Sequence, residues 1–295
     1  MLPHLLILLA LVAGPASGQT LPRTADGKPD LQGIWRPVNR ASYNLEDHVA
    51  RHDMPAGMSV VDGGKIPYQP WASEQQLRNF ENRSSEDPLR NCFLPGVPRI
   101  MAMESPFHIF QTTNHIAITF EWQQVFRLIY TNGSPPLYAG IESWMGNSRG
   151  HWEGDVLVVE VIDQNDKTWL DASGNFHSEE IFVTERYQLL DTDTIEYEAT
   201  IDDPKVFTRP WTIKLELQRQ THMDGILEYQ CQAEKEEANG DFERDENTWY
   251  PASVPVDNEP FDADASEGLP LPTTLAEIPR LSDGTPNISG FFMAD

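Results

Sequence analysis

Two stretches of the sequence, IEYEATI at residues 195–201 and WTIKLELQR at residues 211–219, alternate between apolar and polar side chains. Successive side chains of a β-strand point to opposite faces, so this alternation predicts two strands that each bury one face. In the first stretch, every second residue from Ile195 would face the core, and the glutamates between them would face solvent. This stretch of the chain therefore predicts an antiparallel β protein.

Similar patterns extend in both directions from these two stretches. Further strands are expected at 31–35, 107–112, 115–122, 125–131, 156–162, 177–189 and 227–233. Turn signals such as Asn132-Gly133 favour hairpins between neighbouring strands. A series of antiparallel hairpins closes most easily into a barrel, because closure removes the exposed strand edges. We expect a mainly β fold, an antiparallel meander that closes into a barrel.

A long excursion is expected between the first strand and the rest of the barrel. Residues 37–70 are rich in Pro, Gly and His without periodicity, which predicts an ordered loop. A capping box at Ser73 and Gln76 predicts a short helix that ends by Arg83. The expected parts are a signal peptide (1–18), the first strand with the excursion (19–106), the barrel core (107–233) and an acidic, Pro-rich tail (234–295). Within the tail, residues 279–292 repeat six positions of residues 22–35 in register.

The N-terminus and the cysteines predict an exported protein. A short apolar core at 5–13 precedes a small-residue cleavage site at 16–18, which is typical of a signal peptide. No later stretch approaches the roughly 20 apolar residues that a membrane helix needs. We expect a periplasmic or secreted protein in which Cys92 and Cys231 form a disulfide. The alternative is two separate buried thiols.

The charge and the absent motifs limit the kinds of partner. The chain has 21 basic and 46 acidic residues and a net charge of −25, which argues against a nucleic-acid or anionic-membrane partner. Solubility or a salty habitat explains the acidity most simply, and cation binding is a second interpretation. Nucleotide, dinucleotide and paired-cysteine motifs are absent, so we expect no cofactor. A small molecule is the expected partner, while a bound metal and the oligomeric state stay open.

The polar run NDKTWLDASGNFHSE at 165–179 is the strongest candidate for a functional site. Counting by twos from His177 along the strand expected to follow places Glu179 and Glu185 on the same face as Ile181 and Val183. Burying an ionised side chain is costly unless it is paired or bound, so a polar cavity is expected inside the sheet. His177, oriented by Asp171 or Glu179, would then be a general acid/base. The alternatives are a purely structural network and a metal-binding set.

Four more residues are candidates for ligand contact. Arg127 alternates with apolar neighbours and would also face inward, where it is the best partner for Glu185. Such a pair is either structural or grips an anion. Trp169, flanked by Asp166 and Thr168, is the tryptophan best placed to stack on a ligand.

Several motifs together resemble a family of exported bacterial proteins of largely uncharacterised function. They are DGKPDLQGIW (26–35), WEGDVLVV (152–159), NDKTWLD (165–171), HSE (177–179), VTER (183–186) and TIDDP (200–204). The resemblance covers most of residues 22–231 and implies a periplasmic or secreted β protein, with His151 as a departure from the expected basic residue. A weaker likeness, the Gly33-Ile34-Trp35 of the first strand, is similar to lipocalin-like barrels and supports a lipocalin-like fold only.

The sequence thus predicts an exported β-barrel protein with a polar small-molecule site at the barrel mouth. In the enzymatic version, a cofactor-independent lyase, isomerase or hydrolase uses His177, and Arg127 holds an anionic or carbonyl oxygen. The alternatives are a binding protein for a small molecule or carbohydrate, and a structural protein of the envelope.

Overall fold

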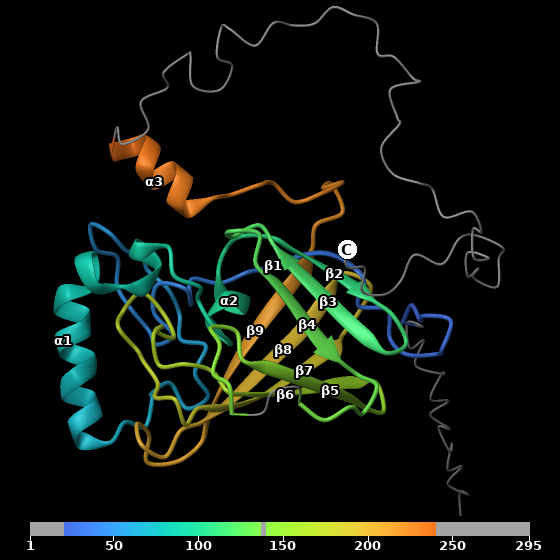
Figure 1. Ribbon diagram of the computed structural model, residues 1–295, viewed down its shortest axis with the longest axis horizontal. Helices are drawn as coiled ribbons and strands as arrows, with labels where there is room; N and C mark the ends of the chain where they lie inside the picture. The colour runs from blue at the N-terminus through green and yellow to red at the C-terminus, as the bar shows by residue number, and fades with distance from the viewer. Residues whose placement is uncertain (1–20, 137–139, 240–295) are drawn as a thin grey trace, which may run out of the picture. The chain divides into compact units, whose positions relative to one another are not determined.

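The protein is a closed β-barrel. The computed structural model describes residues 21–136 and 140–239, which contain nine strands in one closed sheet (Figure 1). The strands are β1 (Gly33–Pro37), β2 (Phe107–Gln111), β3 (His115–Phe120), β4 (Phe126–Tyr130), β5 (Asn147–Glu153), β6 (Val156–Ile162), β7 (Phe182–Leu189), β8 (Thr194–Asp202) and β9 (Trp211–Arg219). The predicted mainly β barrel is confirmed.

Each strand pairs with its neighbours in the sequence, and β9 pairs with β1 to close the ring. All pairs are antiparallel except β4 and β5, which run parallel at Ile129–Ser148 and Tyr130–Arg149. The barrel is therefore the predicted antiparallel meander except at this one junction. The connection from β4 to β5 is long enough to bring the chain back to the end of the barrel where β4 began.

The barrel interior is a packed core, as the alternation predicted. Along β8 the residues Ile195, Tyr197, Ala199 and Ile201 are all buried, and the residues between them are partly exposed. Trp35 of β1 is fully buried, and its indole nitrogen donates to the carbonyl oxygen of Leu31. Burying this apolar surface is the main stabilising contribution to the fold.

One end of the barrel, where β6 ends, β7 begins and β8 turns into β9, is covered by loops, and we call it the covered end. The predicted excursion lies here as an irregular segment: Val61 bridges to Ile213 and Tyr68 to Phe207. The segment between β6 and β7 packs on the excursion, with a hydrogen bond from the Ala172 amide to the Ser42 carbonyl. Figure 1 shows α1 (Pro70–Glu86) beside this layer.

The helices differ from the expected ones. Helix α1 begins at Pro70 after Gln69, which makes no side-chain cap, so the capping box predicted at Ser73 is wrong. Proline suits the first position of a helix because its missing N–H is not needed there. Two short helices, η1 (Pro88–Asn91) and α2 (Arg99–Ala102), precede β2. The strand predicted at 227–233 is also wrong: α3 (Cys231–Asn239) occupies its last three residues.

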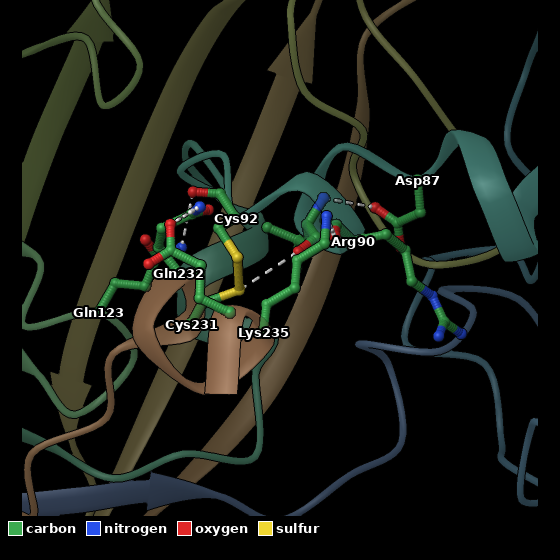
Figure 2. Close-up of a disulfide and its surroundings, with 9 residues drawn as sticks. Asp87, Arg90, Cys92, Gln123, Cys231, Gln232 and Lys235 are labelled. Carbon is green, nitrogen blue, oxygen red and sulfur yellow. Dashed lines mark hydrogen bonds between the residues drawn. A yellow bond between two sulfur atoms is a disulfide. The ribbon is translucent and has the colours of Figure 1, made fainter. Parts of the chain in front are cut away.

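The predicted disulfide between Cys92 and Cys231 is present (Figure 2). It joins the segment after η1 to the first residue of α3, across 139 positions of the sequence. Two hydrogen bonds support the junction, from Gln123 Nε2 to the Cys92 carbonyl and from Lys235 Nζ to the Arg90 carbonyl. The disulfide therefore holds α3 against the loops before β2.

Some expectations fall elsewhere in the chain. The signal peptide, most of the acidic tail and the repeat at 279–292 lie outside the described residues. Among residues 21–136 and 140–239, none of the helices has the length and apolar character to cross a membrane.

Candidate functional site

The polar run predicted from the sequence forms the loop between β6 and β7, at the covered end. The seven polar side chains of this loop that are buried are Gln164, Asn165, Thr168, Asp171, Ser173, Asn175 and His177. Buried polar groups are stable only where hydrogen bonds replace their lost water contacts. We refer to residues 164–177 as the polar loop.

Asp171 is the structural centre of the polar loop. Its carboxylate accepts hydrogen bonds from the amides of Leu45 (2.8 Å), Ser173 (2.9 Å) and Asn175 (3.2 Å), and from the Asn175 side chain. Full burial raises the pKa of Asp171 to about 6, although the donors of Asn175 and Leu45 and the charge of Arg99 act in the opposite direction. This arrangement agrees with the structural interpretation, in which Asp171 fixes the turn.

Further hydrogen bonds tie the polar loop to its surroundings. Gln164 donates to the Val97 carbonyl (2.9 Å) and accepts from the Val97 amide (2.7 Å). Thr168 Oγ1 donates to the Pro95 carbonyl at 2.9 Å, and Asn79 of α1 donates to the Gly174 carbonyl at 3.0 Å. Gly174 has φ = +80°, and a Cβ there would lie 2.5 Å from Asn79, so only glycine fits this contact.

His177 has one nitrogen engaged and one free. Its Nδ1 lies 2.9 Å from the Ser178 carbonyl oxygen, and a carbonyl can only accept, so Nδ1 carries the proton. Its Nε2 is buried and has no hydrogen-bond partner within the described part of the chain. Burial lowers the pKa of His177, while the Ser178 carbonyl, Asp203 and Asp166 act to raise it. The ring is therefore neutral at pH 7, with an unused lone pair on Nε2.

Glu179 does not face the interior, so the predicted orientation is wrong. Its carboxylate is at the surface, where Lys205 Nζ donates to it at 2.6 Å. The reason is that β7 begins only at Phe182. Residues 178–181 form a turn closed by the Ile181 amide and the Ser178 carbonyl, so counting by twos from His177 fails before the strand begins.

Arg127 and Glu185 form the predicted buried pair, inside the barrel. Arg127 Nη1 donates to Glu185 Oε1 at 2.9 Å, and Nη2 donates to Oε2. Tyr187 and Tyr197 donate their hydroxyls to Glu185 Oε1 at 3.0 and 2.9 Å, and Ser148 Oγ accepts from Arg127.

Electrostatics favour the charged form of Arg127. Burial is the largest single effect and works against ionised Arg127, but Glu185, Tyr187 and Tyr197 together raise the pKa of Arg127 above its ordinary value. Burial, followed by the charge of Glu185, raises the pKa of Tyr187 and Tyr197 well above 10. Every group in this network has a partner, which is typical of a structural pair.

Asp166 and Trp169 lie in the polar loop close to His177 in sequence. Asp166 is exposed, and its charge is one of those that raise the pKa of His177. Trp169 is partly buried and forms a backbone bridge with Phe176. The polar loop thus contains Asp166, Trp169, Asp171 and His177, while Arg127 and Glu185 lie in the barrel interior and Glu179 at the surface.

The covered end also contains residues that the sequence did not single out. Tyr68 of the excursion stacks on Phe176 with ring centroids 6.2 Å apart, and its hydroxyl donates to Asn175 at 2.8 Å. Arg99 and Asp87 form a second buried, bidentate ion pair. No periodic pattern marks these partners, because they come from irregular segments far apart in the chain. In residues 21–136 and 140–239, no three His, Cys, Asp or Glu side chains are grouped closely enough to hold a metal ion.

Asp171→Asn provides a pH-dependent test of this geometry. The pKa of Asp171 is raised above the unfolded value of about 4, so the folded state binds the extra proton and wild-type stability falls as pH rises from about 4 to 6. The variant lacks this titration. Its side-chain NH₂ would also point toward backbone amides that donate to the wild-type carboxylate, so one of these donors would lose its acceptor. We expect it to be about 1 kcal/mol less stable at pH 7.5 and about 3 kcal/mol less stable at pH 4.5.

Urea unfolding of both proteins at each pH measures this difference. Asp224→Asn, at an exposed position, is the control and should leave stability within about 0.5 kcal/mol. A difference between wild type and Asp171→Asn that does not change with pH would contradict the raised pKa.

Comparison with known proteins does not assign the chain to a family. Scans against protein-family models and against curated proteins both find no match to the chain.

Proposed function

We propose that the protein is an exported β-barrel protein in which His177 acts as a general acid/base on a polar small molecule, without a cofactor. The observation that carries the proposal is the state of the imidazole. Its Nδ1 proton is fixed by the Ser178 carbonyl, and its Nε2 lone pair has no partner among the described residues. A neutral, oriented imidazole with a free lone pair is the form required of a general base.

Nearby carboxylates favour the protonated imidazole that forms once His177 has accepted a proton. When Nε2 takes a proton, the ring becomes cationic, and Asp203 and Asp166 favour that form. Asp203 is held in place because it accepts from the Ser178 amide (2.6 Å) and hydroxyl (2.9 Å). Asp166 and Trp169, in the same loop, are the proposed contacts for the substrate's polar groups and its ring or chain.

The proposal leaves out four of the residues expected from the sequence, since Asp171 fixes the turn of the polar loop. Arg127 and Glu185 satisfy each other within the barrel, and Glu179 is paired with Lys205 at the surface. It also requires motion, because His177 is only 3% exposed and its Nε2 lies below the surface. Substrate would reach Nε2 when the polar loop and the excursion separate.

The location of the protein is part of the proposal. The Cys92–Cys231 disulfide supports an oxidising compartment, in agreement with the expected signal peptide. We infer a periplasmic or secreted protein, of the exported kind that its motifs resemble.

Solvent deuterium exchange tests the proposed activity without a known substrate. The mature protein is incubated in D₂O with a pool of polar carbonyl compounds, hydroxy acids and sugars. Mass spectrometry then detects deuterium incorporation or the gain or loss of water. We expect turnover of at least one compound, reduced about 100-fold or more in His177→Gln. The matched control His222→Gln, at an exposed histidine, should keep full activity.

Two further readouts separate the alternatives. Long-range ¹H–¹⁵N spectra should show His177 as the Nδ1–H tautomer with a pKa below 6.5. Compounds that bind wild type but not His177→Gln, without turnover, would indicate the binding protein. A variant that loses only stability, in a protein that neither binds nor converts any compound, would indicate a structural role and overturn the proposal.

A further inference from the structure

A second polar site lies on the outer surface of the barrel, away from the polar loop. It is a pocket of about 430 Å³ between the end of β1, the residues before β2 and the residue that follows β9. Its polar lining comes from Arg36, Asn39, Arg40, Glu104 and Gln220. Pockets of this size accommodate small metabolites.

Arg36 presents unused donors to this pocket. Its position in β1 points outward from the barrel, where the side chain is exposed. Its Nε donates to the Glu104 carbonyl at 2.6 Å, which fixes the plane of the guanidinium. Its two terminal nitrogens have no partner within the described residues. An arginine held in this way can bind a carboxylate through two parallel hydrogen bonds.

The second arginine is already engaged with a carboxylate. Arg40 is ion-paired with Glu104, with side chains 50% and 26% exposed. Ion pairs this exposed contribute little to stability, so another carboxylate can replace Glu104 at a small cost. Glu104 therefore acts as an internal competitor for any anion that enters the pocket.

Two amides add neutral hydrogen-bonding groups. Asn39 Oδ1 accepts from the Ala41 amide at 2.8 Å, and its buried Nδ2 has no partner in the described part of the chain. Gln220 donates through Nε2 to the Gln218 carbonyl, which leaves its Oε1 to accept a hydroxyl. The volume exceeds that of a single inorganic ion, and this mixture of groups matches a ligand with both a carboxylate and hydroxyls.

We propose that this pocket binds a small hydroxylated organic acid, such as a sugar acid. The carboxylate is bound by Arg36, Arg40 turns from Glu104 to the ligand, and Gln220 contacts a hydroxyl. The net charge of −25 repels anions at long range, so recognition depends on these direct contacts. This site is independent of His177.

The test is calorimetric titration of the mature, full-length protein at constant ionic strength. Glucuronate is the probe, glucose is its neutral counterpart, and inorganic phosphate represents a simple anion. We expect glucuronate to bind at least about tenfold more tightly than either. Arg36→Gln should weaken glucuronate binding about tenfold or more, because a charge-assisted bidentate contact is lost.

Glu104→Gln gives the opposite and more discriminating result. It removes the internal competitor, so glucuronate should bind about two- to fivefold more tightly. The controls change the same charge elsewhere: Arg209→Gln and Glu81→Gln, at exposed positions, should leave binding unchanged. Circular dichroism and thermal unfolding show whether each variant keeps its fold.

Three results would overturn the proposal. They are no binding of glucuronate by wild type, unchanged binding in a folded Arg36→Gln variant, and weaker binding in Glu104→Gln. Phosphate binding as tight as glucuronate binding would overturn the organic-acid assignment, since it would leave only a nonspecific anion contact.

Discussion

Replacing Glu185 by Ala should lower the free energy of unfolding by about 3–5 kcal/mol, because it leaves the guanidinium of Arg127 buried without a counter-charge. Arg127 and Glu185 are 3% and 0% exposed, so water cannot replace the lost carboxylate. The hydroxyls of Tyr187 and Tyr197 would lose their acceptor in the same variant. Urea unfolding followed by tryptophan fluorescence measures the change.

The double variant Arg127→Met/Glu185→Leu distinguishes an unpaired charge from lost packing. Both charges are then absent, so we expect most of the stability to return, to within about 1–2 kcal/mol of wild type. Glu198→Ala removes the partly exposed partner of the exposed Lys214 and should cost less than about 1 kcal/mol. If the double variant were as unstable as Glu185→Ala, desolvated charge would not be the cause.

Removing the disulfide should have an effect of similar size. The bridge joins residues 139 positions apart, so it strongly restricts the unfolded chain. For a loop of this length, the chain-entropy model gives about 5 kcal/mol of stabilisation. We expect Cys92→Ala/Cys231→Ala to lose about that amount in urea unfolding, and wild type under a reducing agent to unfold at the same midpoint.

This experiment has its own control and contrary outcome. Reducing agent added to the double alanine variant should change nothing. Unchanged stability of that variant would mean that α3 and the loops before β2 remain associated without the bridge, for example through Lys235 and the Arg90 carbonyl. The entropic contribution would then be absent.

The strands were predictable wherever one face of the strand is buried and the other is exposed to solvent. The predicted 156–162 and 211–219 match β6 and β9, and β8 extends one residue beyond the prediction at each end. In β8 and β9 the burial of every second residue is read directly from the alternation, whereas β6 was recognisable as a nearly continuous apolar run. The Arg127–Glu185 pair was predictable for the same reason, since both positions could be counted along a strand.

The remaining elements lacked this signal. Strand β5 reads NSRGHWE and has hardly any apolar residue, so only its pairing with β4 and β6 identifies it. In the segment predicted as strand 227–233, alternation suggested β structure, but QAEKEEAN after Cys231 has strong helix formers. Local propensity therefore outweighed a short period-two pattern.

The candidate site was predictable in composition but not in geometry. The polar loop was evident because many hydrogen-bonding and titratable side chains follow one another in this stretch. Its contacts were not, because the partners of Asp171 and Gln164 are backbone groups of Leu45 and Val97. Backbone partners in distant irregular segments leave no trace in the side-chain pattern. The orientation of Glu179 was wrong for another reason, because β7 begins only at Phe182 and residues 178–181 form a turn.

The parallel junction between β4 and β5 is required by the parity of the barrel. Going once around the ring, each antiparallel neighbour reverses the strand direction, and the ring closes only after an even number of reversals. With nine described strands, one parallel junction leaves eight reversals, whereas an entirely antiparallel ring of nine could not close. A relative with one strand more or fewer would therefore have to make β4 and β5 antiparallel, or acquire a second parallel junction.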